Sequence, residues 1–231
     1  ARVAFMYETG RGLPQDHYLA ASWYLSAAEK GYPPAQHRLG LLFVDGHEDA
    51  YLPEQSPTGE AADMELAFAL GIADASWSSE LTHLLPLVEP ADVRILGARD
   101  ADILRAEGVP SLGDSIELAD GIRLAADPED IVESACASLP DPWWFHLDLD
   151  VLSTEALPAV DYPQRGGLGW EELATVATRA LMAHPRGWDV TIYNPDLDPE
   201  RIHARRIVAF IVSVVERVVE GTRDVHQLVV A

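Results

Sequence analysis

Three ionisable side chains, Asp45, His47 and Asp49, stand at every second position after the apolar run at 41–44. Side chains alternate between the two faces of a strand, so this spacing places Asp45 and His47 on one face. Asp49 joins them if the chain stays extended. Carboxylates beside an imidazole suit a metal ion, although a D-x-H-x-D pattern on its own also fits a polar loop.

A second cluster, His146, Asp148 and Asp150, follows about one hundred residues later at the end of another apolar segment. Both clusters end expected parallel strands, where open α/β sheets place their ligands. Carboxylates that converge there repel one another, and a cation relieves the repulsion. An oxygen-rich site with a histidine suits manganese better than zinc or calcium. A lone D-x-D can simply end a strand, and His146 lies deeper, so we expect it to support the ligands or pack in the core.

Strand-like and helix-like segments alternate after residue 40. The expected strands are 41–45, 93–98, 143–150 and 188–193, and the expected helices are 59–71, 100–108, 170–184 and 198–221. The last helix has Asp198 as its N-cap, Pro199 at its first position and Gly221 as its stop. This alternation predicts an α/β domain at 41–231, with a mainly parallel sheet covered by helices on both faces in three αβα layers.

The chain before residue 40 has a different pattern. The segment "YETGRGLPQDHYLAASWYLSAAEKGYPPAQHRLG" closely resembles one Sel-like repeat, a relative of the tetratricopeptide repeat. The resemblance implies a separate helical unit at 1–40 that mediates protein contacts or self-association. One repeat cannot bury its own face, so a helical hairpin packed on the main domain is an equal alternative.

The composition narrows the classes of partner. Sixteen basic residues against 38 acidic ones give a formal charge of −22, which disfavours nucleic acid and anionic membranes. Cys136 is the only cysteine, so the sequence has no internal disulfide and no thiolate cluster. The apolar run at 207–215 is too short to cross a bilayer, and the first residues lack a signal-peptide pattern. We therefore expect a cytoplasmic protein that acts on a small molecule.

Three segments in order resemble the ureohydrolase superfamily of arginases, agmatinases and formiminoglutamases. They are "FVDGHEDAYLPE" with "SPTGEAADM", then "FHLDLDVLSTEALPAVDYPQRGGLGWEEL", then "TIYNPDLDP", and the likeness runs from about residue 41 to 219. The last segment is similar to a divergent arginase-like branch of that superfamily.

This resemblance implies two manganese ions and a hydrolase that cleaves a linear C–N bond. The positions that match metal ligands are Asp45, His47, Asp49, Asp148 and Asp150. Asp45 and Asp148 match the two ligands that bridge the metals. The metals lower the pKa of a shared water, the resulting hydroxide attacks a guanidine or amidine carbon, and Asp49 holds or relays the proton.

The chain departs from the superfamily pattern in its substrate and metal residues. A sixth ligand, a His in a Gly-Gly-Asp-rich turn, is expected upstream, where the sequence offers only His17 and His37. Ile192 occupies the position of the glutamate that pairs with a guanidinium, so arginase activity itself is doubtful. Glu60, in the loop after the first motif, is a candidate substrate-binding residue. The family's early strands have no counterpart ahead of residue 41, so we expect the strand at 41–45 to have an exposed edge.

Two functions remain open from the sequence. The first is a manganese-dependent hydrolase that uses one or two ions. The second is a non-catalytic or degenerate metal-binding domain joined to a protein-interaction repeat. Retention of five matching ligands favours metal binding, whereas Ile192 and the absent sixth ligand argue against efficient guanidine hydrolysis.

Overall fold

The computed structural model describes residues 39–74 and 85–229, with side chains up to residue 222. The expected repeat at 1–40 therefore lies almost wholly outside the described residues. The boundary between the two expected domains stays a prediction.

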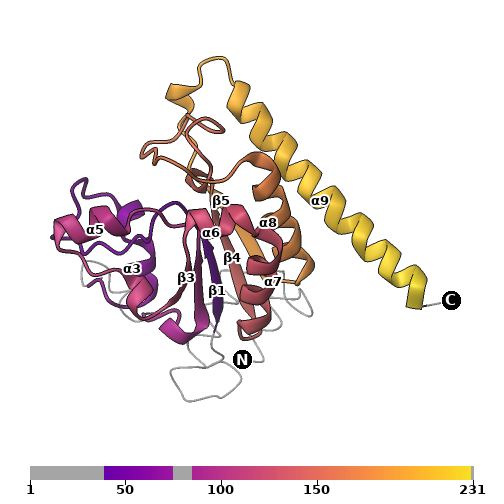
Figure 1. Cartoon of the computed structure of the whole chain (residues 1–231), viewed down its shortest axis with the longest axis horizontal. Coiled ribbons are helices and arrows are strands. Elements are labelled where there is room, and N and C mark those ends of the chain that lie inside the picture. Colours follow the sequence, from indigo (N-terminus) through magenta and orange to yellow (C-terminus); the bar gives the residue numbers. More distant parts are fainter. Residues whose placement is uncertain (1–38, 75–84, 230–231) are drawn as a thin grey trace, which may run out of the picture.

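The described chain folds around a five-stranded sheet in which every pair of neighbours is parallel (Figure 1). Its order is β3-β2-β1-β4-β5. The strands are β1 (Gly40–Val44), β2 (Val93–Leu96), β3 (Glu117–Ala119), β4 (Trp143–Asp148) and β5 (Gly187–Thr191). Because β1 pairs with both β2 and β4, the expectation of an exposed edge at 41–45 was wrong. The edges of the described sheet are β3 and β5.

Helices cover both faces of the sheet, as the alternation predicted. Figure 1 shows α3 and α5 on one side and α7, α8 and α9 on the other. The helices are α3 (Glu65–Ala69), α5 (Ala101–Glu107), α6 (Gly121–Ala126), α7 (Pro128–Ser138), α8 (Trp170–Met182) and α9 (Ile202–Val229). The short 3-10 turns are η2 (Ala61–Met64), η3 (Pro90–Asp92), η4 (Leu112–Asp114), η5 (Leu149–Val151) and η6 (Pro195–Leu197). The three-layer α/β prediction is confirmed.

Strand alternation divides the core into two clusters. In β1, Leu42 and Val44 pack with the α7, α8 and α9 side, whereas Leu41 and Phe43 pack with the α3 and α5 side. Both sets are buried, which is why β1 reads as a continuous apolar run.

Several element predictions need correction. The expected helix at 59–71 is η2 followed by the short α3, and the expected strand at 143–150 ends at Asp148 and continues as η5. Asp198 does cap α9, since its carboxylate accepts the backbone N–H groups of Ile202 and Ala204. Pro199 nevertheless precedes the helix, and α9 runs through Gly221 to Val229.

The long helix α9 extends well beyond the sheet (Figure 1). It buries Ile207, Phe210 and Val214 against the domain. Among the described helices, none combines the length and apolarity that a membrane crossing requires.

Candidate metal centre

The first acidic cluster begins directly after β1. Asp45 is only 1% exposed, and its Oδ1 accepts the backbone N–H of His47 at 2.7 Å. This bond turns the chain, and Asp49 then adopts a φ of 45°, in the left-handed region. The chain is therefore not extended from Asp45 to Asp49, and the alternation argument used for this cluster was wrong in its mechanism.

The second cluster begins at the last residue of β4. Asp148 Oδ1 accepts the backbone N–H of Asp150 at 2.8 Å, and its Oδ2 accepts the hydroxyl of Thr191 at 2.9 Å. Asp150 lies in η5 beyond the strand. The side chain of Asp148 is thus fixed both by its own turn and by the neighbouring strand β5.

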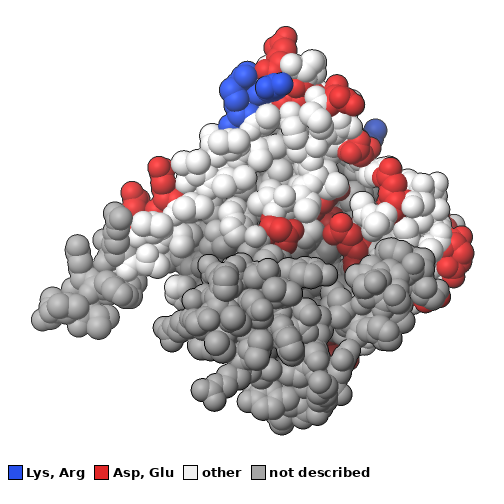
Figure 2. Space-filling model, turned by 180° about the vertical axis from the view of Figure 1, so that it is seen from behind, with Lys and Arg blue, Asp and Glu red and all other residues white. Residues whose placement is uncertain are grey.

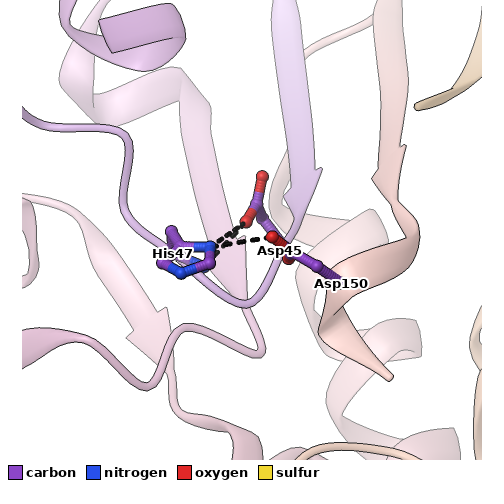
Figure 3. Close-up of side chains that lie close together, drawn as sticks. All are labelled: Asp45, His47 and Asp150. Carbon is purple, nitrogen blue, oxygen red and sulfur yellow. Dashed lines mark hydrogen bonds and ion pairs between the residues drawn. The ribbon is translucent and has the colours of Figure 1, made fainter. Parts of the chain in front are cut away.

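The two clusters meet because β1 and β4 are adjacent and parallel. Asp150 Oδ1 accepts the backbone N–H of Gly46 at 2.9 Å, and its Oδ2 lies 2.9 Å from His47 Nδ1. His47 Nδ1 is also 3.6 Å from Asp45 Oδ1. Figure 3 shows the imidazole of His47 turned toward both carboxylates, one from each cluster. The convergence expected from the sequence is present.

Burial and mutual repulsion raise the pKa of three of these carboxyl groups. Burial, together with the negative charge of Asp150, raises the pKa of Asp45 to about 7. Burial and the neighbouring carboxylates raise the pKa of Asp148 and of Asp49 well above the usual range. Such a cluster is short of positive charge, which a divalent cation supplies.

The pKa values of His47 and Asp150 shift in the directions that favour an ion pair between them. Burial opposes the charged form of His47, but its hydrogen bonds to Asp150 and Asp45 raise the pKa of the imidazole to about 11. Burial likewise opposes ionisation of Asp150, yet the hydrogen bond and charge of His47 lower the pKa of that carboxyl. The charge of the imidazole and the charge of the carboxylate thus stabilise each other.

Two sets of potential ligand atoms have the spacing of a metal site. Within each set the atoms lie within 4.8 Å of one another; the sets are Asp45, His47 and Asp150, and Asp45, His146 and Asp148. Asp45 belongs to both, as a ligand shared by two ions would. Among the described residues, Asp49 is in neither set, although it lines the same cavity.

The residues fit a divalent cation on a further ground. His146 Nε2 is buried and has no hydrogen-bond partner in the described part of the chain. An imidazole nitrogen left unpaired among carboxylates costs free energy unless something binds it. Oxygen donors with imidazole nitrogen suit manganese and related ions.

A cavity of about 680 Å³ lies over the centre. Its wall includes Asp45, His47, Asp49, Asp148, Asp150 and Ile192. Its volume suits a small-molecule ligand. On the face shown in Figure 2, acidic side chains are spread over the described surface, whereas basic ones gather near one end. This charge distribution favours the approach of cations.

The predicted substrate residues occupy different places. Glu60 is exposed and does not line the cavity, but its Oε2 accepts the hydroxyl of Tyr162 at 3.1 Å, and Tyr162 does line it. Ile192 lines the cavity and has a φ of 58°. A β-branched residue rarely adopts that conformation, so the backbone is strained at this wall.

Sequence reasoning missed the residues that hold the loops in place. Glu48 is fully buried, and its carboxylate accepts the hydroxyl of Ser111 and the backbone N–H of Leu112 at 2.5 Å. Arg99 donates to the carbonyl oxygens of Asp150 and Val151, which fixes η5. Arg99 follows β2 at the carboxyl end of the sheet, so the strand-end argument applied to β1 and β4 would have found it.

The fold and this centre together define an α/β protein with a candidate metal centre at the carboxyl end of its sheet. A family model described as "Arginase family" matches residues 16–216, and the chain belongs to that family. The ureohydrolase resemblance is thereby confirmed. The match begins at residue 16, within the segment expected to form a Sel-like repeat, and the repeat itself is not shown.

Individual relatives agree with this assignment. The chain is 28% identical over 198 residues to the arginase of Eremothecium gossypii, covering 81% of this chain and 47% of that protein. It is 30% identical over 176 residues to the N(omega)-hydroxy-L-arginine amidinohydrolase of Streptomyces lavendulae, covering 76% and 58%. The arginase structure from Bacillus caldovelox superposes with a TM-score of 0.65 at 22% identity, covering 84% of this chain and 72% of that one.

The chain spans about half the length of the curated relatives it matches. The structural similarity, at 22% identity, shows the shared fold alone. The matches therefore establish the arginase family for the chain.

Proposed function

We propose that this chain is a manganese-dependent hydrolase that cleaves a linear C–N bond in a guanidino or amidino compound. The observation that carries the proposal is the convergence of two strand ends on one buried acidic centre beneath a 680 Å³ cavity. The names of the relatives, arginase and amidinohydrolase, support the substrate class.

The residues proposed to hold the metal are Asp45, His47, Asp49, Asp148 and Asp150. A pair of divalent cations at such a site lowers the pKa of a water molecule and stabilises negative charge on the reacting group. Asp45 is buried and shared by both sets of ligand atoms, so it is positioned to join the two halves of the centre.

Asp49 is proposed to hold or relay the proton during breakdown of the substrate. Its carboxyl is buried beside Asp45, Asp148 and Asp150, the residues proposed to hold the metal. It also lies on the cavity wall. From that place its free oxygen can accept a proton from the attacking water and pass it to the departing nitrogen.

A second candidate function is a metal-binding domain without catalysis. Ile192 favours it, because an apolar side chain on the cavity wall provides no ion pair for a guanidinium group. Both candidates require the metal, so they differ only in turnover.

Metal content and turnover, measured on the same preparations, test both candidates. The chain would be incubated with excess Mn²⁺ and desalted, its metal measured by elemental analysis, and its activity then assayed as ornithine release from arginine and from N(omega)-hydroxy-L-arginine. We expect bound manganese in the parent chain and its loss in Asp148→Ala, because that change removes a ligand and the anchor of the Asp150 backbone.

Asp196→Asn is the matched control, since Asp196 is exposed outside the cavity. Its metal content should equal that of the parent. A parent chain without manganese would refute the hydrolase proposal. Bound manganese with no turnover on any guanidino or amidino compound would instead support the non-catalytic candidate.

A further inference from the structure

His146 occupies an unusual position for an ionisable residue, in the interior of a central strand. It lies in β4, opposite Phe43 of β1 and Asp189 of β5. The residue is 7% exposed, and its ring stacks on Phe43 with centroids 4.7 Å apart and an interplanar angle of 14°. Packing therefore fixes the plane of the imidazole.

The two ring nitrogens of His146 have opposite environments. Nδ1 lies 2.8 Å from Asp189 Oδ2, within hydrogen-bond distance. Nε2 has no hydrogen-bond partner in the described part of the chain, and the nearest carboxylate oxygens, on Asp45 and Glu65, are each 3.9 Å away. When Nδ1 donates to Asp189, Nε2 carries a lone pair and faces the acidic centre.

This arrangement is typical of histidines that bind a metal ion in proteins. A ligating imidazole usually donates its other N–H to a carboxylate, which fixes the tautomer and makes the ligand more basic. Asp189 occupies that place here, and Trp144 Nε1 donates to its other oxygen. Trp144 and His146 are two residues apart in β4, so their side chains lie on the same face of the sheet. One carboxylate of β5 therefore orients both rings.

We infer that His146 binds a metal ion directly through Nε2, together with Asp45 and Asp148, and that Asp189 orients it. These three ligand atoms lie within 4.8 Å of one another. The inference rests on the proposed function, because it requires that the centre take a divalent cation. It replaces the supporting or core role expected for His146 from the sequence.

The consequence is that each half of the centre has its own imidazole. One set of ligand atoms contains His47 and Asp150, and the other contains His146 and Asp148. Asp45 belongs to both. The superfamily resemblance places the second imidazole on an upstream turn. Here the sheet itself provides one, from a residue whose backbone is paired on both sides.

A purely structural role is the competing explanation. In that case a protonated His146 would pair with Asp189, Asp45 and Glu65, and its removal would lower stability without changing the metal ligands. The test must therefore report on the nitrogen atoms bound to the metal as well as on activity.

Pulsed electron paramagnetic resonance of the Mn²⁺-loaded full chain provides that readout, because it detects nitrogen nuclei bound to the ion. The decisive variant is His47→Gln, which removes the other candidate imidazole in the described part of the chain and leaves His146 untouched. We expect nitrogen modulation to persist in His47→Gln and to vanish in the double variant with His146→Gln.

Mn²⁺ titration gives the second readout. His146→Gln is expected to lose one ion or weaken one binding step by at least ~100-fold, and Asp189→Asn to weaken the same step by about 10- to 100-fold while keeping the nitrogen signal. His184→Asn, at an exposed histidine far along the chain from both clusters, should leave both steps unchanged.

The outcomes separate this inference from the proposed function. A parent chain that binds Mn²⁺ but shows no nitrogen modulation in His47→Gln would overturn the role of His146 and leave the hydrolase proposal standing. A parent chain that binds no Mn²⁺ would overturn both. If His146→Gln fails to fold, His47→Gln made together with His17→Gln and His37→Gln still decides, because it requires no change at His146.

Discussion

The loop after β1 and the segment after β4 both deliver carboxylates to one centre, but they are held in different ways. The loop is secured from outside the sheet by two contacts. The buried carboxylate of Glu48 accepts the Leu112 N–H of η4, and Asp100 Oδ2 accepts the Glu48 backbone N–H at 3.1 Å. In the β4 segment, Asp148 is secured from within the sheet by Thr191 of the neighbouring strand, and Arg99 holds only η5 beyond it.

This difference shows two ways in which a fold can fix the position of a carboxylate side chain. A strand end inherits its geometry from backbone pairing, so little beyond one hydroxyl is needed to aim Asp148. A bent loop has no such template, so it depends on a charged residue buried for that purpose. The loop after β1 should therefore be the more vulnerable of the two regions to a single substitution.

The largest effect is expected for Glu48→Ala, which tests the anchor of the β1 loop. The change leaves the Ser111 hydroxyl and the Leu112 N–H without their acceptor and opens a cavity, at a cost of about 2–4 kcal/mol. Chemical denaturation with an unchanged m-value would measure it. The exposed Glu54→Ala, in the same loop region, should stay within about 0.5 kcal/mol of the parent. Equal effects for the two would show that Glu48 is no anchor.

A smaller effect is expected for Thr191→Val, which tests the β4 segment. Valine keeps the branched shape but removes the hydroxyl that donates to Asp148, a loss of about 1 kcal/mol. Denaturation and Mn²⁺ titration would measure stability and metal affinity. Thr191→Ser, which retains the hydroxyl, should restore metal binding to the parent level. A Ser variant as weak as Val would mean that packing, and not the hydrogen bond, aims Asp148.

The smallest change in stability is expected for Ile192→Glu, one residue beyond Thr191. The side chain is only partly buried, and the left-handed backbone tolerates an unbranched residue better than isoleucine. The new carboxylate faces the cavity and can pair with a guanidinium. We expect detectable hydrolysis of a guanidino compound above the parent rate, measured as urea release, with Ile192→Gln as the uncharged control. No gain in the Glu variant would show that other substrate contacts limit turnover.

The sequence predicted the convergence of the carboxylates at this centre because its signals are local. Asp45, Asp148 and Asp150 each follow a recognisable apolar strand, and adjacent parallel strands bring their ends together. The reason first given for the D-x-H-x-D cluster was nevertheless wrong, because the N–H of His47 bonds to Asp45 and bends the chain. The spacing indicated residues that the structure brings together, through a turn that periodicity does not describe.

The remaining errors arise where distant contacts override local preference. Gly221 was expected to end the last helix, but α9 continues through it. The strand at 41–45 was expected at an edge, yet β4 covers one side of it with residues about one hundred positions away. Glu48 gave no sign of being an anchor, because its partners at 111–113 are contributed by a different part of the chain. Sequence alone does not reveal such pairings.

The register of β1 with β4 has a consequence for folding. Phe43 pairs with His146, and Val44 with Leu147, across a chain separation that makes this a slow, non-local step. A slip of one residue would turn His146 and Asp148 to the opposite face and leave their carboxylate and imidazole in an apolar core. A cation that binds the chain only in the correct register would shift the equilibrium from alternative pairings toward the correct one by mass action. The ion would then stabilise the correct strand register during folding, in addition to its role in the reaction.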